Sequence, residues 1–153
     1  MTVTIRRGTT ADGPALAGLR WRRLTEERGY GGTDRAEFVG LFSEWLVRNS
    51  ATHLPFVALG DADELVGMAW LMIADRVPTP KRRTRRSGDV QSVYVVPDLR
   101  GAGVGRSLMD SVLAEARALG LEHVTVHSSP EAVPFYERTG FAHDPEWLRW
   151  LPE

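Results

Sequence analysis

The sequence has no cysteine, almost no net charge and no long apolar run, and each absence excludes a class of protein. Without cysteine, the chain can form no disulfide, no thiolate metal site and no cysteine nucleophile. A formal net charge of -1 provides no overall field that attracts nucleic acid or an anionic membrane. The longest apolar stretch, residues 65–74, is about half the length of a membrane span. The first residues lack the apolar segment of a signal peptide, so we expect a cytoplasmic protein without a membrane partner.

The length and composition are those of one globular domain. The chain has 153 residues, of which 42% are hydrophobic and 25% are charged. A chain of this size buries one hydrophobic core. No internal repeat and no long low-complexity stretch divides it, so we predict a single domain over residues 1–153.

Hydrophobic periodicity predicts a mixed α/β domain with the element order β-α-α-β-β-β-α-β-α-β. The predicted strands are residues 3–7, 54–59, 65–74, 89–96 and 122–127. The predicted helices are residues 10–28, a helix that begins at Asp34, and residues 104–119 and 132–138. The tail from Phe141 to Leu151 is predicted to form one or two final strands. The basic run from Lys81 to Arg86 is predicted to be a solvated loop.

A glycine-rich turn joins the predicted strand 89–96 to the predicted helix 104–119. It contains Arg100, Gly101, Gly103 and Gly105. Glycines let the backbone approach a ligand closely, and the N-terminus of a helix attracts anionic oxygens. The turn is therefore a candidate phosphate cradle. The alternative is an ordinary glycine-rich connection between a strand and a helix.

Two well-known phosphate-binding loops do not fit this turn. A Walker A loop needs glycine at position 100 and lysine at position 106, where the chain has Arg100 and Arg106. A dinucleotide fingerprint needs G-x-G-x-x-G, and both possible starts place a residue other than glycine at its last position. The pattern that is present is Arg-x-x-Gly-x-Gly, from Arg100 through Gly103 to Gly105.

The strand VQSVYVVP, the loop LRGAGVGRSL and the segment FYERTGF together resemble the acetyl-CoA-binding core of the GNAT (N-acetyltransferase) superfamily. The match is strong over residues 89–142, and the earlier residues match in element order only. The resemblance implies a single-domain GNAT-like α/β fold, in which helices flank a mixed, mostly antiparallel sheet with a splayed central strand pair. It also implies acetyl-CoA as co-substrate, no metal, and a primary amine of a small molecule or peptide as acceptor.

The resemblance also implies which residues bind the cofactor. The loop backbone from Arg100 to Ser107 would hold the CoA pyrophosphate, and the exposed edge of residues 93–95 would pair with the pantetheine arm. The Val95 N–H would polarise the thioester carbonyl as an oxyanion hole does. Ser129 stands where many members have an asparagine that contacts pantetheine. The predicted cofactor-binding residues are Val93, Tyr94, Val95, Arg100, Gly101, Ala102, Gly103, Val104, Gly105, Arg106, Ser107, Ser129 and Tyr136.

Two residues are candidates for proton transfer. Tyr136 stands where the superfamily usually places a general acid, and a phenol can protonate the departing CoA thiolate. The alternative is that Tyr136 is a core aromatic residue of its short helix. Asp89 stands where some members have a general base, and the two-residue period of a strand places it on one face with Gln91, Val93 and Val95. The alternative is a solvated carboxylate at the end of the basic loop.

Three functions are compatible with the sequence. The first is an enzyme that moves acetyl from CoA to an amine, and the second is a catalytically inactive acyl-CoA-binding regulatory module of the same fold. The third is a nucleic-acid-binding protein that uses residues 81–86, which the neutral net charge disfavours. His123 and His127 lie in a strand without a third ligand, so we expect no zinc site. The apolar tail around Trp147 and Trp150 predicts a homodimer.

Overall fold

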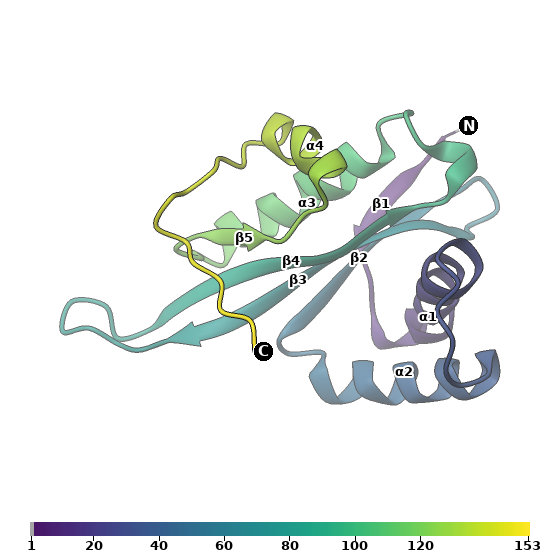
Figure 1. Cartoon of the computed structure of the whole chain (residues 1–153), viewed down its shortest axis with the longest axis horizontal. Coiled ribbons are helices and arrows are strands. Elements are labelled where there is room, and N and C mark those ends of the chain that lie inside the picture. The colour runs from purple at the N-terminus through teal and green to yellow at the C-terminus, as the bar shows by residue number, and fades with distance from the viewer. Residues whose placement is uncertain (1) are drawn as a thin grey trace.

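The computed structural model describes residues 2–153, and a five-stranded sheet forms its centre (Figure 1). The strands are β1 (Thr4–Arg7), β2 (His53–Leu59), β3 (Leu65–Arg76), β4 (Arg85–Val95) and β5 (Val124–Val126). They lie in the order β1-β2-β3-β4-β5 and are antiparallel except for the parallel pair β4–β5. The predicted mixed, mostly antiparallel sheet is confirmed.

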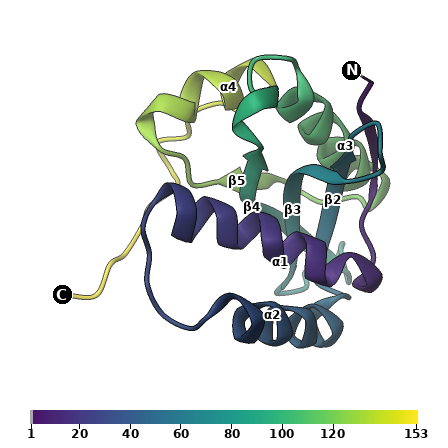
Figure 2. The same ribbon diagram turned by 90° about the vertical axis from the view of Figure 1, so that its right-hand side faces the viewer.

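Helices cover both faces of this sheet (Figure 2). On one face lie α1 (Gly13–Trp21), which continues into the π-helical turn η2 (Arg22–Glu27), and α2 (Arg35–Asn49). On the other face lie α3 (Val104–Ala118) and α4 (Val133–Arg138). Asp34 begins α2 as predicted, because its carboxylate accepts a hydrogen bond from the Glu37 N–H at 2.8 Å. Within residues 2–153, every helix is too short or too polar to cross a lipid bilayer.

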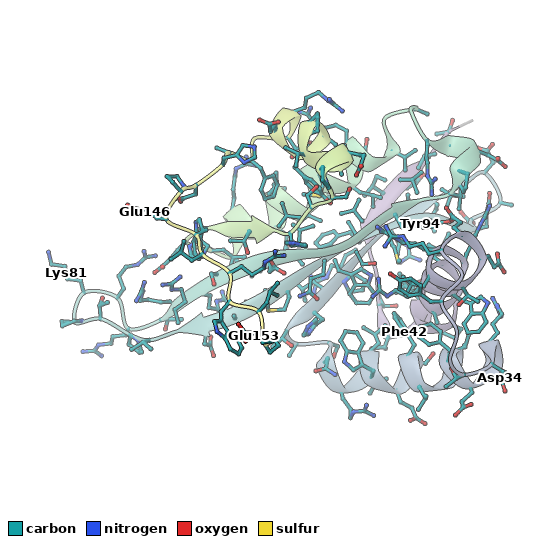
Figure 3. The ribbon with its side chains drawn as sticks, in the orientation of Figure 1. Asp34, Phe42, Lys81, Tyr94, Glu146 and Glu153 are labelled. Atoms are coloured by element: carbon teal, nitrogen blue, oxygen red, sulfur yellow. The ribbon has the colours of Figure 1, made fainter. Side chains whose placement is uncertain are left out.

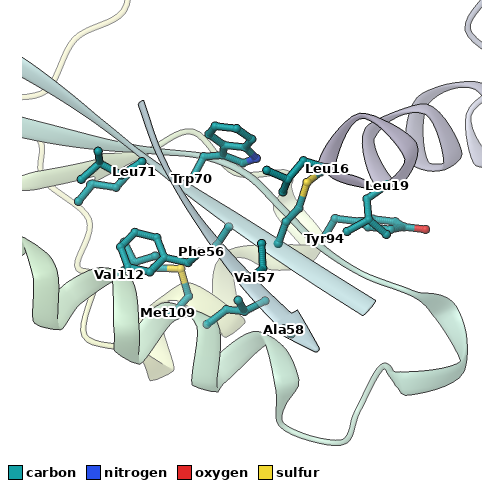
Figure 4. Close-up of a cluster of buried hydrophobic side chains, with 14 of the residues drawn as sticks. Leu16, Leu19, Phe56, Val57, Ala58, Trp70, Leu71, Tyr94, Met109 and Val112 are labelled. Atoms are coloured by element: carbon teal, nitrogen blue, oxygen red, sulfur yellow. The ribbon is translucent and has the colours of Figure 1, made fainter. Parts of the chain in front are cut away.

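The hydrophobic core lies on both sides of β2 and β3 (Figure 4). The run 65–74 is almost entirely buried because helices cover both faces of β3. Met109 and Val112 of α3 pack on the same face as Phe56 of β2. Leu16 of α1 packs on the opposite face. The apolar face predicted for residues 104–119 thus packs α3 against the sheet. This packing also fixes the position of the glycine-rich turn that precedes α3.

The C-terminal tail forms no strand within the described residues, so the prediction of one or two final strands is wrong. Residues 141–153 have no ladder hydrogen bonds and contact β5 and its neighbours through side chains. The Trp147 ring lies 4.7 Å from the ring of His123, whereas Leu148 and Trp150 are 91% and 83% exposed. The tail has the apolar residues that predicted a strand, but no neighbouring strand or helix in the described residues buries Leu148 and Trp150.

The basic run is a loop only up to residue 84, so the prediction of a solvated loop is wrong for its last two residues. Arg85 begins β4, and its guanidinium donates to both carboxylate oxygens of Glu122 at 2.7 and 3.0 Å. Arg82 lies 3.2 Å from the same carboxylate. Arg86 donates to the carbonyl of Leu119 at the end of α3. Three of the five basic side chains are therefore held by the protein itself.

Candidate functional site

Strands β4 and β5 pair at only three positions and then separate. The three pairs are Gly88–Val124, Asp89–Thr125 and Val90–Val126. Beyond Val90, β4 continues beside β3 as far as Val95, whereas the chain after β5 turns towards α4 (Figure 1). The predicted splayed strand pair is confirmed. The separation leaves the edge of β4 after Val90 without a neighbouring strand on the β5 side.

A β-bulge interrupts β4 at this edge. Gln91 lies opposite Trp70 and Tyr94 lies opposite Met68, so two residues of β4 stand against one residue of β3. One of the two is Ser92, whose φ of 59° lies in the left-handed region that strand residues avoid. The bulge bends the strand at the point where the gap opens.

The bulge also reverses the alternation of β4 side chains, because one extra residue shifts all later residues to the opposite face. Asp89 and Gln91 precede it and lie on the face covered by α1 and α2. Val95 follows it and lies on the other face, with its Cγ2 3.9 Å from the Cβ position of Gly105 in α3. The prediction that Asp89, Gln91, Val93 and Val95 share one face is therefore wrong.

The backbone of Val95 points into the gap between β4 and β5. The Val96 N–H donates a hydrogen bond to the carbonyl of Val66 in β3 at 2.9 Å. Antiparallel strands alternate between hydrogen-bonded and non-hydrogen-bonded pairs, so the N–H and the carbonyl of Val95 point away from β3. The Val95 carbonyl accepts a hydrogen bond from Arg100 Nε at 2.9 Å on that side. The Val95 N–H thus has the orientation that polarising a carbonyl in the gap requires.

The glycine-rich turn closes one end of the gap. Gly101 and Gly103 have φ values of 82° and 84°, which glycine adopts without strain. A Cβ atom at either position would meet no other group within 4 Å, so only backbone borders the space there. Gly103 is also the N-cap of α3, a helix of 15 residues whose first N–H groups face the turn. Bare backbone at a helix N-terminus is the arrangement that binds phosphate.

One groove with a volume of about 1120 Å³ connects the glycine-rich turn, the free edge of β4 and α4. Ala102 and Ser107 do not line it, and neither does Asp89. The predicted residues that do line it are Val93, Tyr94, Val95, Arg100, Gly101, Gly103, Val104, Gly105, Arg106, Ser129 and Tyr136. The structure thus brings together residues that lie far apart in the sequence.

Tyr136 lies on α4 in the wall of this groove. Its ring packs against Phe135 and Phe141, with centroid distances of 5.0 and 5.6 Å. Burial raises the pKa of the Tyr136 hydroxyl above its ordinary value, and the charge of Arg23 partly opposes this. The phenol is therefore protonated at neutral pH and available as a proton donor. The ring has the packing of a core residue, while the side chain as a whole borders the groove.

Asp89 lies beside a second cavity of about 640 Å³, which Trp147 also lines. Its Oδ1 accepts a hydrogen bond from the Thr125 hydroxyl at 2.7 Å, and its Oδ2 accepts one from Gln91 at 3.2 Å. Both carboxylate oxygens are therefore engaged within the sheet. Tyr136 borders both cavities, but the structure separates Asp89 from the free edge of β4.

His123 and His127 each contact a residue of the C-terminal tail. The His123 ring packs against Trp147 with the ring planes tilted by 58°, and His127 Nε2 accepts a hydrogen bond from Arg149 at 2.9 Å. Among residues 2–153, no three His, Asp or Glu side chains are grouped so that they could hold a metal ion.

Two arginines that the sequence analysis missed contact the bulge. Arg20 of α1 donates to the Ser92 hydroxyl at 2.6 Å, and Arg23 of η2 donates to the Val93 carbonyl. Their spacing of three residues places them on one helix face. That spacing was visible in the sequence, but nothing in the sequence indicated that this face lies against β4.

Glu27, at the end of η2, links the N-terminal helix to the glycine-rich turn. It accepts hydrogen bonds from the Tyr94 hydroxyl and, at 2.9 Å, from Arg100. Tyr94 points towards α1 (Figure 3), and burial together with the Glu27 contact raises its pKa to about 12. The Tyr94 side chain therefore joins β4 to the N-terminal helix, and its backbone, which alternates with that of Val95, is directed towards β3.

The family model described as "Acetyltransferase (GNAT) domain" matches residues 36–147. The chain belongs to the GNAT acetyltransferase family. The match begins in α2, so it includes helices and strands that the sequence resemblance covered in element order only.

Curated relatives and solved structures agree with this family. Serotonin N-acetyltransferase 2 of Oryza sativa subsp. japonica is 34% identical over 69% of this chain, and glucosamine 6-phosphate N-acetyltransferase of Trypanosoma brucei brucei is 40% identical over 52%. The chain spans 65% and 53% of the length of these two relatives. A predicted acetyltransferase of Clostridium acetobutylicum, solved with acetyl-CoA, has a TM-score of 0.76 at 24% identity and covers 98% of this chain and 96% of its own.

Proposed function

We propose that the protein transfers the acetyl group of acetyl-CoA to a primary amine of a small molecule or peptide. The observation that carries the proposal is the groove that joins the left-handed glycine turn, the free edge of β4 and the Tyr136 phenol. Family membership supports the same activity, as does the acetyl-CoA in the Clostridium acetobutylicum structure.

Acetyl-CoA would extend through the groove from the glycine-rich turn to Tyr136. The backbone N–H groups of the glycine-rich turn, with Arg106 beside them, would bind the pyrophosphate. The pantetheine arm would extend along the free edge of β4 and pair with its backbone as a further strand does. Ser129, across the gap, would hydrogen-bond to the arm.

The chemistry then needs one attack and three proton transfers, the last of which restores Tyr136. The amine nitrogen forms a bond to the thioester carbon, and the Val95 N–H stabilises the negative charge that develops on the carbonyl oxygen. The carbon–sulfur bond breaks, and Tyr136 protonates the CoA thiolate. The nitrogen releases its proton to water, because neither aspartate nor glutamate lines the described groove and Asp89 lies outside it. The tyrosinate regains its proton from solvent.

A panel of primary amines tests the proposal, with the release of free CoA thiol as the readout. We expect thiol release that depends on the amine and an acetylated product of the corresponding mass. If calorimetry shows CoA binding and no amine releases thiol, the protein is the alternative, a CoA-binding regulatory module. Serotonin and glucosamine 6-phosphate belong in the panel, because enzymes named for these substrates are similar to this chain.

The tail supports a second proposal, that two copies form a dimer. Trp147, Leu148, Trp150 and Leu151 are each more than half exposed, although apolar side chains gain free energy from burial. A second copy of the chain is the partner that would cover them.

A further inference from the structure

The groove carries charge of one sign. Among residues 2–153, no aspartate or glutamate lines it. The arginines that line it are Arg23, Arg28, Arg100, Arg106 and Arg138. The protein as a whole has a net charge of -1, so the positive charge is concentrated at this site and is not a property of the whole surface.

These arginines belong to two groups on different elements. Arg100 and Arg106 flank the glycine-rich turn, and Arg138 ends α4 beside Tyr136. Arg100 and Arg106 lie where the proposed function places the CoA phosphates and account for that charge. Arg23 and Arg28 come from the N-terminal helix instead. Arg23 contacts the bulge at the carbonyl of Val93, which lies before Val95 along the strand and thus away from the turn.

The second group, like Arg20 beside it, forms no direct ion pair within the described residues. None of Arg20, Arg23 and Arg28 forms an ion pair with a carboxylate in residues 2–153. The adjacent carboxylate is Glu27, whose oxygens are taken by Tyr94 and Arg100. Burial, followed by the charge of Arg28, lowers the pKa of Arg20 and Arg23. The half-buried charges of Arg20 and Arg23 and the exposed charge of Arg28 repel one another, and a bound anion removes that repulsion.

The π-helical turn brings this group together. In η2 the backbone hydrogen bonds span five residues instead of four, which widens the turn. Arg23 and Arg28 are five residues apart, and both line the groove. An α-helix would direct residues at this spacing to different sides. π-helical turns are uncommon and frequently occur at functional sites.

We propose that the acceptor amine carries an anionic group, a carboxylate or a phosphate, and that Arg23 and Arg28 bind this group with Arg20 beside them. Guanidinium groups suit both anions, because their fork of N–H donors matches two oxygens at once. Binding the anion at the bulge would hold the amine beside the thioester, which the proposed function places near Val95. This inference rests on the proposed function and specifies its substrate class.

Matched amine pairs that differ by one anionic group test it. Comparing glucosamine 6-phosphate with glucosamine tests whether a phosphate on the acceptor is recognised. Comparing phenylalanine with 2-phenylethylamine tests whether a carboxylate is recognised. We expect the anionic member of at least one pair to have a kcat/KM about 10- to 100-fold higher, the range of hydrogen bonds to charged groups. The preferred pair identifies the anion. Equal values within both pairs overturn the inference and leave the acetyltransferase proposal intact.

Arg28→Gln is the most informative variant, because Arg28 is exposed and makes no hydrogen bond that the fold needs. We expect it to lower kcat/KM for the anionic acceptor about 10-fold, with the neutral acceptor and the KM for acetyl-CoA within about twofold of wild type. Arg48→Gln on α2, also exposed but outside the groove, is the matched control. A raised KM for acetyl-CoA in Arg28→Gln would assign this arginine to CoA and overturn the inference.

A binding arm separates this inference from the proposed function. With CoA bound, calorimetry compares glucose 6-phosphate with glucose, neither of which has an amine. Binding of the phosphate alone, weakened in Arg28→Gln, supports the anion site even if no amine in the panel is acetylated. If neither sugar binds and no amine is acetylated, both proposals fail.

Discussion

Replacing Tyr136 by phenylalanine removes the proposed acid and little else. The ring keeps its contacts with Phe135 and Phe141, at 5.0 and 5.6 Å between centroids. The hydroxyl makes no hydrogen bond to other groups in residues 2–153, and the hydrogen bonds that Tyr136 accepts from Thr139 and Phe141 go to its backbone carbonyl. No buried donor or acceptor is therefore left without a partner, and we expect the free energy of unfolding to change by less than about 0.5 kcal/mol.

The expected loss of activity is about 100-fold in kcat. General acid catalysis contributes roughly 10²- to 10⁴-fold. The lower end applies here, because a thiol has an ordinary pKa of about 8.5 and its thiolate already leaves readily. A factor of 100 corresponds to about 2.7 kcal/mol of transition-state stabilisation. The KM for acetyl-CoA should stay within about twofold, since the proposed function assigns the binding to the turn and the β4 backbone.

The pH profile provides a second readout of the same residue. An acid must be protonated to act, so wild-type kcat falls as the pH rises through the pKa of Tyr136. Burial raises that pKa above the ordinary value of 10.0, so the fall lies above pH 10. Tyr136→Phe should lack this limb.

Single-turnover measurements with a working amine are the appropriate assay, because they report the chemical step and not product release. Tyr30→Phe, at an exposed tyrosine outside the groove, is the matched control. If chemistry limits the rate and Tyr136→Phe turns over within about twofold of wild type, Tyr136 is a packing residue and solvent protonates the thiolate.

Further predictions concern binding, stability and assembly. Gly103→Val should weaken CoA binding measured by calorimetry, whereas Gly120→Val, at another left-handed glycine with open space but outside the groove, should not. The pKa of Tyr94 is about 12 in the folded protein against 10.0 for a free tyrosine. The protonated Tyr94 therefore adds roughly 2 kcal/mol to the free energy of unfolding below pH 10, and this contribution is lost as the pH rises towards 12. Denaturant unfolding of Tyr94→Phe should not show that loss of stability. Asp34→Ala should lower stability by about 1 kcal/mol, seen as a thermal midpoint roughly 3 °C lower. Light scattering should give about twice 17.0 kDa for the wild type and about 17.0 kDa for Trp147→Ser. A wild-type particle of 17.0 kDa would contradict the dimer.

The part of the site that follows from local chemistry could be predicted from the sequence. Gly101 and Gly103 adopt left-handed conformations at a strand-to-helix turn. Glycine adopts such conformations without strain, so its presence in the sequence indicates them. The apolar spacing of residues 104–119 predicts α3 and therefore the direction in which the turn opens. Asp34 likewise acts through its own neighbours. Each of these features depends on residues close together in the chain.

Features that depend on neighbours distant in the sequence could not be predicted. The bulge at Ser92 is defined by its pairing with β3, and strict alternation therefore placed Asp89 on the wrong face relative to Val95. The tail has the apolar residues of a strand but no partner strand in residues 2–153. Arg85 was assigned to a loop because Glu122, which neutralises it, lies 37 residues away.

The same limit explains why the acceptor side of the groove was missed. Arg20 and Arg23 bind the bulge, and Glu27 binds the turn arginine, so a single helical segment holds both ends of the β4 edge. A change in that segment therefore alters two things at once, the surface proposed to meet the acceptor and the position of Arg100 next to the proposed CoA phosphate site. We therefore expect that replacing the N-terminal helix alone does not exchange acceptor specificity, because the helix also carries Glu27, whose contacts with Tyr94 and Arg100 position the turn.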